Sequence, residues 1–551
     1  MPLKTRREFL VHSGVALTGI AASPRLLAAQ APTAAPQKMR GLMVDAGRVP
    51  ESLSYYRRVI DFCSEWELNT LHFRLADDQG TALRFTSAPD LLAHKDAFAP
   101  DQLHDLAVYA QTRGVDLLPE LESFGHTGFI TRSPAYAHLL DSSAEGEAEF
   151  TGVIPVNPET LALFRKLYGE VASIFPSIYF HGGCDEVNWG GSLLSRRALQ
   201  TRTRAQIWAD YLNSLNHVSQ GLGKHFIVWG DFILHKEPEI LDKLDKSIII
   251  MDWDYRENNS AQVQEAYLKA RANGSRAIGA PGLIHYEWGA RPGGEQLHNI
   301  DAFADAYLDK NDPGSLGLIL TNWIPSRYIQ NSIWDGFGYA AVAFQQGTAT
   351  AQTSGFHRFV EKHYQANWNE TWDEAFRLIY DFAPSVQDRE TSSWMGLRLI
   401  TPWSSDEELT AALKEKSPRH NPFPRLRSLL ALLEPAVRRN LADFKAFTLS
   451  ADYLESLYWR QSVIAQTADN SSAALLIQII ARRDQALAAA LNADWDNGRP
   501  ADSPAKSQPI FNLAPKDQLL YQWTKAAAYS ASLAAHPGCF SQLIAASIQA
   551  S

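Results

Sequence analysis

Short apolar runs alternate with amphipathic segments from residue 40 to about residue 350. Continuous apolar runs of this kind are typical of parallel strands that are buried on both faces. Eight such runs stand at 41–45, 70–76, 115–121, 178–183, 225–231, 247–253, 276–281 and 316–323. Segments with helical periodicity lie between them, at 51–67, 101–113, 158–175, 205–222, 260–273 and 298–309. Pro158 and Gly114 stand where a helix start and a helix end are expected.

Eight strands with intervening helices predict an α/β fold, a (β/α)8 TIM barrel over residues 40–350. A doubly wound open sheet would alternate in a similar way. The count of eight strands is what favours the barrel.

The strand pattern stops near residue 355, and a helical pattern replaces it. Leu426, Leu429, Leu430 and Leu433 recur at the spacing of one helix face. We therefore expect a helical C-terminal domain over 355–551, packed on the barrel.

The N-terminus resembles a twin-arginine export signal. Arg6 and Arg7 precede Phe9 and a short Gly/Ala-rich apolar stretch, and small residues at 29–31 offer a cleavage site. The prediction is a signal peptide over 1–31, a linker over 32–39 and a periplasmic or secreted protein. A disordered basic tail is the alternative. No later run reaches 18 apolar residues, so no permanent membrane span is expected.

The composition limits the classes of partner and cofactor that we expect the protein to bind. The formal net charge of −10 argues against nucleic acid and anionic membranes, which bind basic patches. The 3 cysteines are widely separated, which predicts no disulfide framework. No Cys/His spacing suggests zinc and no glycine-rich phosphate loop occurs, so we expect no metal and no cofactor. The oligomeric state stays open.

Polar and aromatic residues gather at the predicted strand ends, where barrels carry their active sites. Six ends show them: Asp77–Asp78; Glu120, Glu122 and His126; His181 to Glu186; Trp229 and Asp231; Asp252 to Tyr255; Asn322–Trp323. Carboxylates beside tryptophans fit a neutral polyhydroxylated ligand, which indicates a carbohydrate.

Asp185 and Glu186 are adjacent, behind His181 and two glycines. Successive side chains on an extended backbone point in opposite directions, so the two acids cannot share one task. Without further context, a solvated turn or a helix-cap pair would be the more common explanation. As catalytic groups they would divide the work around one sugar, and their repulsion would raise the pKa of the acid.

The stretch "HGGCDEV" resembles the signature of family 20 glycoside hydrolases, the β-N-acetylhexosaminidases. Further motifs follow in the order of that family: "RGLMVDAGR", "LNTLHFRLADDQG", "LLPELESFGHTGF", "VNPET", "IVWGDFIL" and "LILTNW". Together they cover roughly residues 40–345. Cys184, "SFGHTGF" and "WDY" are most similar to the hexosaminidase D branch.

The resemblance implies an exo-acting enzyme that removes terminal N-acetylgalactosamine or N-acetylglucosamine. It also implies substrate-assisted catalysis with retention: the 2-acetamido oxygen of the sugar attacks the anomeric carbon and forms an oxazolinium intermediate. Glu186 would act as general acid and then as base. Asp185 would orient the acetamido nitrogen.

The resemblance also assigns substrate-binding residues, listed here together: Arg40, Asp77, His126, His181, Trp229, Trp253, Tyr286 and Trp323. Arg40 precedes its predicted strand, so the strand pattern alone would not select it. Two positions depart from the family. Trp288 and Pro325 stand where an Asp and a Glu usually contact outer hydroxyls of the terminal sugar, so recognition of O4 and O6 stays open.

Two rival functions remain at this point. One is a non-catalytic glycan-binding protein on a glycosidase barrel, although the presence of both acids argues against it. The other is a barrel glycosidase that uses two distant carboxylates, such as Glu120 and Glu186. Cys184 is interpreted as a small residue that fits a tight loop rather than as a reactive thiol.

Overall fold

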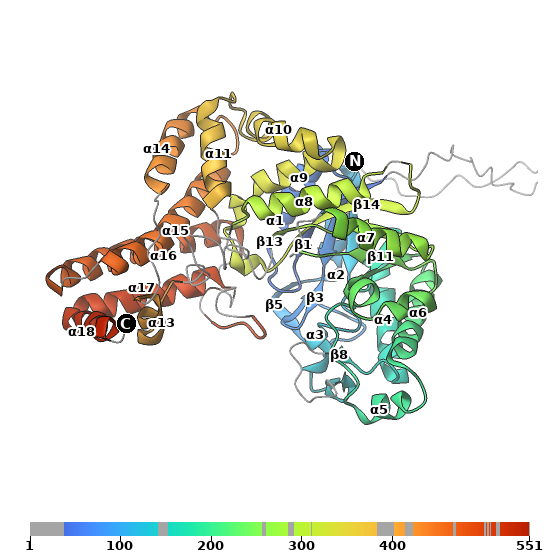
Figure 1. Ribbon diagram of the computed structural model, residues 1–551. Helices are drawn as coiled ribbons and strands as arrows, with labels where there is room; N and C mark the ends of the chain where they lie inside the picture. The colour runs from blue at the N-terminus through green and yellow to red at the C-terminus, as the bar shows by residue number, and fades with distance from the viewer. Residues whose placement is uncertain are drawn as a thin grey trace, which may run out of the picture. The chain divides into compact units, whose positions relative to one another are not determined.

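Eight parallel strands close into a barrel in the computed structural model of the protein (Figure 1). They are β1 (Met39–Asp45), β2 (Thr70–Arg74), β6 (Asp116–Glu120), β9 (Tyr179–His181), β10 (His225–Trp229), β11 (Ile249–Asp252), β12 (Arg276–Gly279) and β14 (Ser315–Asn322). The first and last strands pair in parallel, with Met39 opposite Gly317 and Leu42 opposite Leu320. This pairing confirms the (β/α)8 barrel and excludes an open sheet.

The structure describes residues 38–141, 152–255, 260–284, 291–309, 311–382, 402–413, 422–466, 470–500, 503, 506, 508–513 and 518–549. The predicted signal peptide, residues 1–31, lies outside these residues, as do Tyr286 and Trp288. Within the described residues, no helix is long and apolar enough to cross a membrane.

Helices follow most of the barrel strands. They are α1 (Leu53–Glu65), α2 (Pro100–Thr112), α4 (Pro158–Ile174), α6 (Arg204–Gly221), α7 (Ser260–Ala272), α8 (Gly294–Tyr307) and α9 (Trp334–Gln346). Local chemistry explains their ends. The Asn157 side chain accepts a hydrogen bond from Glu159 N at 3.0 Å before Pro158 opens α4. Gly114 follows α2 with a φ of +72°, a conformation that glycine adopts without a Cβ clash.

Shorter elements complete the barrel region. The strands are β3 (Ala76–Asp77), β4 (Gly80–Leu83), β5 (Ala93–Phe98), β7 (Leu140–Asp141), β8 (Gly152–Val153) and β13 (Gly282–Ile284), and the helices are α3 (Gly128–Thr131) and α5 (Leu193–Leu199). Brief 3-10 and π turns are η1 (Ala137–Leu139), η2 (Asp231–Lys236), η3 (Pro238–Lys243), η4 (Pro325–Arg327), η5 (Gln330–Ser332), η6 (Val360–Tyr364) and η8 (Glu434–Ala436). The apolar run pattern did not reveal the small sheet of β3, β4 and β5.

Beyond β14, every regular element that the structure describes is helical. These helices are α10 (Thr348–Phe359), α11 (Glu370–Phe382), α13 (Asp406–Leu413), α14 (Phe423–Leu433), α15 (Leu441–Gln466), α16 (Asn470–Gly498), α17 (Leu519–Ala535) and α18 (Pro537–Gln549). The long helices α15, α16 and α17 run beside one another (Figure 1). The expected helical C-terminal region is therefore confirmed, and its boundary near residue 355 stays a prediction.

Two ion pairs join the helical region to the barrel. Arg499, just after α16, donates through Nε to Glu51 at 3.0 Å, and both side chains are buried. Arg439 contacts Glu65 at the end of α1 at 2.6 Å, and this pair is partly exposed. Separation of Arg499 from Glu51 would leave an uncompensated buried charge, so this contact opposes separation of the two regions.

The barrel interior changes from apolar to polar along the strands. Side chains alternate along a strand, so every second residue points inward. Met43, Leu118, Ile227, Ile249 and Ile278 belong to one buried cluster, distinct from the cluster between strands and helices. Nearer the carboxyl ends, inward positions carry the buried side chains of Arg74, Glu120, His181 and Trp229. A polar layer therefore supports the loops that carry the candidate residues.

Candidate active site

The loop after β9 has an unusual backbone. Gly183, Cys184 and Glu186 have φ values of +66°, +76° and +46°. A left-handed conformation costs a residue with a side chain about 1–2 kcal/mol. His126 and Ile324, in two neighbouring loops, share this conformation. Strained backbone conformations of this kind are frequent at functional sites, where the surrounding structure holds them in place.

Glycine allows the loop to approach its neighbours closely. A Cβ at Gly183 would lie 2.0 Å from Oε2 of Glu122, and one at Gly182 would lie 2.4 Å from the ring of Phe226. Glu122 also accepts a hydrogen bond from Cys184 N at 3.1 Å. Burial raises the pKa of the Cys184 thiol well above its ordinary value, which supports a packing role for this residue.

The two adjacent acids differ in exposure, although the backbone at Glu186 is left-handed and not extended as the sequence argument assumed. The side chain of Asp185 is 8% exposed, whereas that of Glu186 is 29% exposed. Glu186 N donates to Asp231 Oδ2 at 3.2 Å, which fixes the loop against β10. One acid therefore lies under the surface while its neighbour reaches the opening.

His126, from the loop after β6, connects these acids to a second acidic pair. Its Nε2 lies 3.2 Å from Glu186 Oε2 and 3.9 Å from Asp185 Oδ2. Its Nδ1 lies 3.6 Å from Asp77 Oδ1 and 3.4 Å from Asp78 Oδ2. Burial alone would lower the pKa of His126, but the charges of Asp77 and Asp185 raise it well above its ordinary value. The imidazole is therefore a cation near neutral pH.

The pKa values of Asp185 and Glu186 shift in opposite directions beside the charged imidazole of His126. Burial raises the pKa of Asp185 to about 6, which Asp231 and Glu186 reinforce and His126 opposes. Burial would also raise the pKa of Glu186, but its hydrogen bond from His126 outweighs this and lowers it. The expectation that repulsion raises the pKa of the general acid is therefore wrong for Glu186. The acid whose pKa is raised is Asp185.

Two arginines that were not among the predicted site residues compensate the negative charge of these acids. Arg74 is buried and contacts Asp77, Glu122 at 2.6 Å and Asp45 at 3.4 Å. Arg48 contacts Asp45 at 2.9 Å and Asp77 at 3.2 Å. Arg74 could have been predicted from the sequence, because it is a charged residue at an inward position of an apolar run.

The assignment of Arg40 is corrected by its place on β1. Arg40 is the second residue of that strand, and its Nε donates to the carbonyl of Glu67 at 3.4 Å. That is the amino end of the barrel, opposite the end that carries Asp185. Arg48 lies just beyond the carboxyl end instead, with its guanidinium carbon 5.2 Å from the ring centroid of Trp323.

Aromatic side chains form one side of the site. The rings of Trp229 and Trp323 are 5.7 Å apart. Trp323 Nε1 donates to the Tyr255 hydroxyl at 2.8 Å, and Trp253 stacks on Tyr255 at 5.1 Å. Tyr255 was missed as a site residue because "WDY" did not indicate which aromatic faces inward.

The comparisons with known proteins concern the barrel. Residues 38–291 match the model described as glycosyl hydrolase family 20, catalytic domain. This part of the chain is similar to the catalytic domain of glycoside hydrolase family 20.

Curated relatives also match less than half of the chain. A beta-hexosaminidase of Vibrio furnissii is 24% identical over 282 residues, which are 45% of this chain and 44% of that protein. Beta-hexosaminidase subunit A1 of Dictyostelium discoideum is 26% identical over 268 residues, 45% of this chain and 48% of that protein. The chain thus spans about half the length of the relatives it matches. The solved Flavobacterium johnsoniae chitobiase is 18% identical, covers 80% of this chain and 75% of its own, and has a TM-score of 0.48.

Within the matched part of the chain, Glu120 and His181 have structural partners. Glu120 is buried and accepts a hydrogen bond from Trp229 Nε1 at 2.8 Å, and its other oxygen lies 2.8 Å from His72. His181 Nδ1 accepts a hydrogen bond from Gly183 N at 3.0 Å, and burial lowers the pKa of His181 to about 3. His181 therefore shapes the loop from below, which corrects its assignment to substrate binding. Glu120 is likewise too enclosed to serve as a second catalytic carboxylate.

Among the residues that the structure describes, three sets of side chains have ligand atoms within 4.8 Å of one another, the spacing of a metal site. They are His72, Glu120 and His181; Asp77, Asp78 and His126; and His126, Asp185 and Glu186. A protonated imidazole cannot bind a metal, and the pKa of His126 is raised in the two sets that contain it. In the first set, Trp229 and Gly183 already donate to Glu120 and His181.

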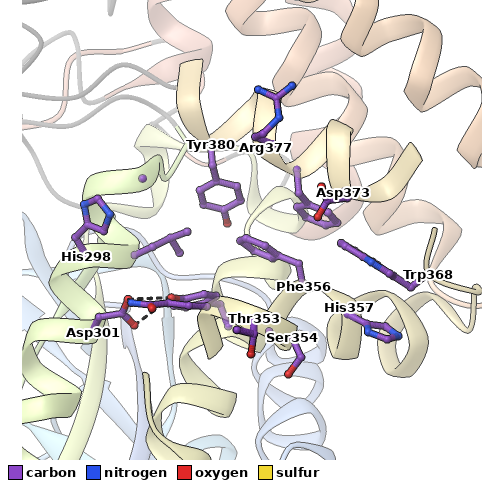
Figure 2. Close-up of a pocket in the computed structure, with 16 residues that line it drawn as sticks. His298, Asp301, Thr353, Ser354, Phe356, His357, Trp368, Asp373, Arg377 and Tyr380 are labelled. Carbon is purple, nitrogen blue, oxygen red and sulfur yellow. Dashed lines mark hydrogen bonds between the residues drawn. The ribbon is translucent and has the colours of Figure 1, made fainter. Parts of the chain in front are cut away.

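A cavity of about 360 Å³ lies elsewhere in the protein, between α8, α10 and α11. Figure 2 shows Asp301, Phe356 and Tyr380 among its lining residues. Asp301 accepts hydrogen bonds from Tyr339 at 3.0 Å and from Gln352 at 2.8 Å (Figure 2). None of the lining residues comes from the strand ends, so the candidate active site remains the one around Asp185 and Glu186.

Proposed function

We propose that the protein is an exo-acting β-N-acetylhexosaminidase that removes a terminal 2-acetamido sugar with retention of configuration. The observation that carries the proposal is the pairing of a buried Asp185 with a partly exposed Glu186, joined through the imidazole of His126. Adjacent acids in such different surroundings suit two separate tasks on one sugar.

Glu186 is the general acid and base of the proposed reaction. Its carboxyl proton passes to the glycosidic oxygen as the bond from that oxygen to the anomeric carbon breaks. In the second step the Glu186 carboxylate takes a proton from water, which attacks the same carbon. Its partial exposure supports this role, because both the leaving group and the water must reach it.

Asp185 holds the acetamido group. As a carboxylate it accepts a hydrogen bond from the acetamido N–H, so the acetamido oxygen lies under the anomeric carbon and forms the new C–O bond of an oxazolinium ion. The substrate supplies the nucleophile, so no second carboxylate is needed across the ring, in contrast to glycosidases with two separated acids. Burial of Asp185 strengthens its attraction for the developing positive charge.

We infer a relaxed preference between the gluco and galacto epimers, or a shift toward the galacto epimer. The two sugars differ at O4, and a site discriminates sharply only where buried polar groups bind that hydroxyl. Pro325 is buried and its side chain offers no acceptor, although its carbonyl accepts from Arg499. The hexosaminidase D resemblance supports the same direction.

An assay with three aryl β-glycosides tests the proposed function. The sugars are N-acetylglucosamine, N-acetylgalactosamine and glucose. Hydrolysis of the two N-acetyl sugars without hydrolysis of the glucoside is the expected result. Equal hydrolysis of the glucoside would contradict acetamido recognition, and a protein that binds the sugars without turnover would be a glycan-binding protein.

We further propose export by the twin-arginine route. The motif around Arg6 and Arg7 supports this proposal. Replacement of both residues by lysine should keep the protein in the cytoplasm of an expressing bacterium. Unchanged appearance of the variant in the periplasm would contradict the proposal.

A further inference from the structure

A segment of the helical region reaches the catalytic network of the barrel. Residues 508–513 lie between α16 and α17, beyond the residues 38–291 that match the family. Asn512 Nδ2 donates to Asp78 Oδ2 at 3.0 Å. The same carboxylate oxygen lies 3.4 Å from His126 Nδ1, and the opposite nitrogen of that ring lies 3.2 Å from Glu186.

The neighbours of Asn512 anchor the segment on both sides. The guanidinium carbon of Arg132 lies 3.5 Å from the ring centroid of Phe511, and Arg132 also donates to the Asp78 carbonyl at 2.9 Å. Leu513 belongs to the buried cluster that contains Trp323. Gln518 accepts from Ile510 N at 3.1 Å, which closes the base of the segment. These contacts hold Asn512 at Asp78.

The backbone of Asn512 explains why asparagine suits this position. Its φ is +58°, in the left-handed region where asparagine is enriched among residues with a side chain. An aspartate tolerates the same backbone but offers no donor. The position therefore combines a special backbone with an N–H group directed at a buried carboxylate.

We propose that Asn512 is a positioning residue for the acid/base Glu186, acting through the carboxylate of Asp78 and the imidazole of His126. This inference rests on the proposed function of Glu186. It gives the helical region a share in the active site: the barrel supplies the reacting groups, and the segment 508–513 fixes the far end of the chain of contacts that orients them.

The charges around His126 define what a change at Asn512 would do. Asp77 and Asp78 face the imidazole from the segment after β2, and Asp185 and Glu186 face it from the loop after β9, while Arg48 contacts Asp77. Loss of the neutral amide would leave these charges unchanged and would remove one of the hydrogen bonds that orient Asp78, whose Oδ1 also accepts from Gly128 N at 2.9 Å. An added carboxylate at position 512 would instead favour the protonated imidazole and repel Asp78.

The test uses two substitutions in the full-length chain, Asn512→Gly and Asn512→Asp. Glycine removes the amide without backbone strain, and aspartate keeps the shape but removes the donor. We expect Asn512→Gly to lower kcat on an aryl N-acetyl glycoside by about 5- to 30-fold, the usual worth of one such hydrogen bond, with KM nearly unchanged. Asn512→Asp should lower kcat further and move the alkaline limb of the kcat profile to higher pH.

The matched control is Asn492→Asp on α16. Asn492 also donates to an aspartate, Asp496, at 3.3 Å, but this pair is exposed and lies outside the site. Thermal unfolding of all variants separates loss of fold from loss of positioning. In a double-mutant cycle, Asn512→Gly should have little further effect in an Asp78→Asn background.

The outcomes are distinct. Wild-type kcat in both Asn512 variants would overturn the inference while leaving the proposed function intact. A raised KM with unchanged kcat would overturn it as well, because it would place Asn512 on the substrate. Absence of hydrolysis by the wild-type enzyme would instead refute the proposed function.

Discussion

His126 Nε2 lies 3.2 Å from Glu186 Oε2, and this contact lowers the pKa of an acid whose burial would otherwise raise it. The unliganded site therefore keeps a charged imidazole beside a charged carboxylate, and the pair holds one proton between them. A bound sugar that excludes water from Glu186 would favour transfer of that proton to the carboxylate. In the proposed reaction, the pair would hold the proton that the leaving group needs.

Replacement of Glu186 by glutamine tests its role as acid. We expect Glu186→Gln to reduce kcat on an unactivated disaccharide by about 10²–10⁴-fold, because general acid catalysis contributes that much. An aryl glycoside with a good leaving group should lose less, since it needs little protonation. Glu239→Gln, at an exposed position, is the control. Near-normal hydrolysis of the disaccharide by Glu186→Gln would refute the assignment.

Replacement of His126 should change the pH profile. In the wild type, the alkaline limb of kcat/KM reports loss of the shared proton at a pKa above the ordinary value for histidine, because Asp77 and Asp185 outweigh the effect of burial. In His126→Gln the proton can reside only on Glu186, so the alkaline limb should move to lower pH. His138→Gln removes an exposed His–Glu pair of 2.8 Å and should leave the profile unchanged. An alkaline limb at the same pH in His126→Gln would show that the imidazole holds no part of the proton.

Asp185 should cost the folded protein stability. Its pKa is raised from 3.8 to about 6, so between these values the folded state binds more protons than the unfolded state. Stability therefore falls as pH rises through this window, and the loss persists above pH 6. Asp185→Asn should gain about 1–3 kcal/mol of unfolding free energy at pH 7.5 and nothing at pH 4.

Thermal unfolding at the two pH values measures this effect. Asp105→Asn, an exposed change on α2, supplies the baseline. The stabilised Asp185→Asn enzyme should also be inactive, which is the expected trade between stability and function. A lower Tm for Asp185→Asn at pH 7.5 than for wild type would mean that His126 and Arg74 outweigh burial at this site.

The fold followed from the sequence because its signal is local. Strands buried on both faces require continuous apolar runs, and each of the eight runs became a barrel strand. The small sheet of β3, β4 and β5 gave no such signal, since β3 and β4 have only 2 and 4 residues and the first four residues of β5 alternate between exposed and half-buried.

Only part of the site could be predicted from the sequence, because its decisive contacts join residues that are far apart along the chain. Asp185 and Glu186 were found through their motif, but the sign of the pKa shift on Glu186 depends on His126, 60 residues away. Asn512 and Asp78 are separated by 434 residues, and no periodicity records such a contact. Arg48 could have been found, because it follows its strand whereas Arg40 precedes the interior of the same strand.

Gly183 should tolerate no side chain, because two effects combine there. Its φ of +66° disfavours alanine, and a Cβ would lie 2.0 Å from Glu122 Oε2, an acid already held by Arg74 at 2.6 Å. We expect Gly183→Ala to displace the loop that carries Asp185 and Glu186, and therefore to abolish activity while lowering Tm. Gly114→Ala isolates the backbone effect, since Gly114 has a φ of +72° and no atom within 4 Å of its Cβ position.

The comparison of these two variants decides the cause. Gly114→Ala should cost only the conformational term of about 1–2 kcal/mol and keep full activity. Gly183→Ala should lose more stability than this, because Glu122 cannot retreat without breaking its contact with Arg74. Equal losses of Tm in the two variants, with activity kept in both, would mean that Glu122 moves freely and that the loop does not depend on the close approach at Gly183.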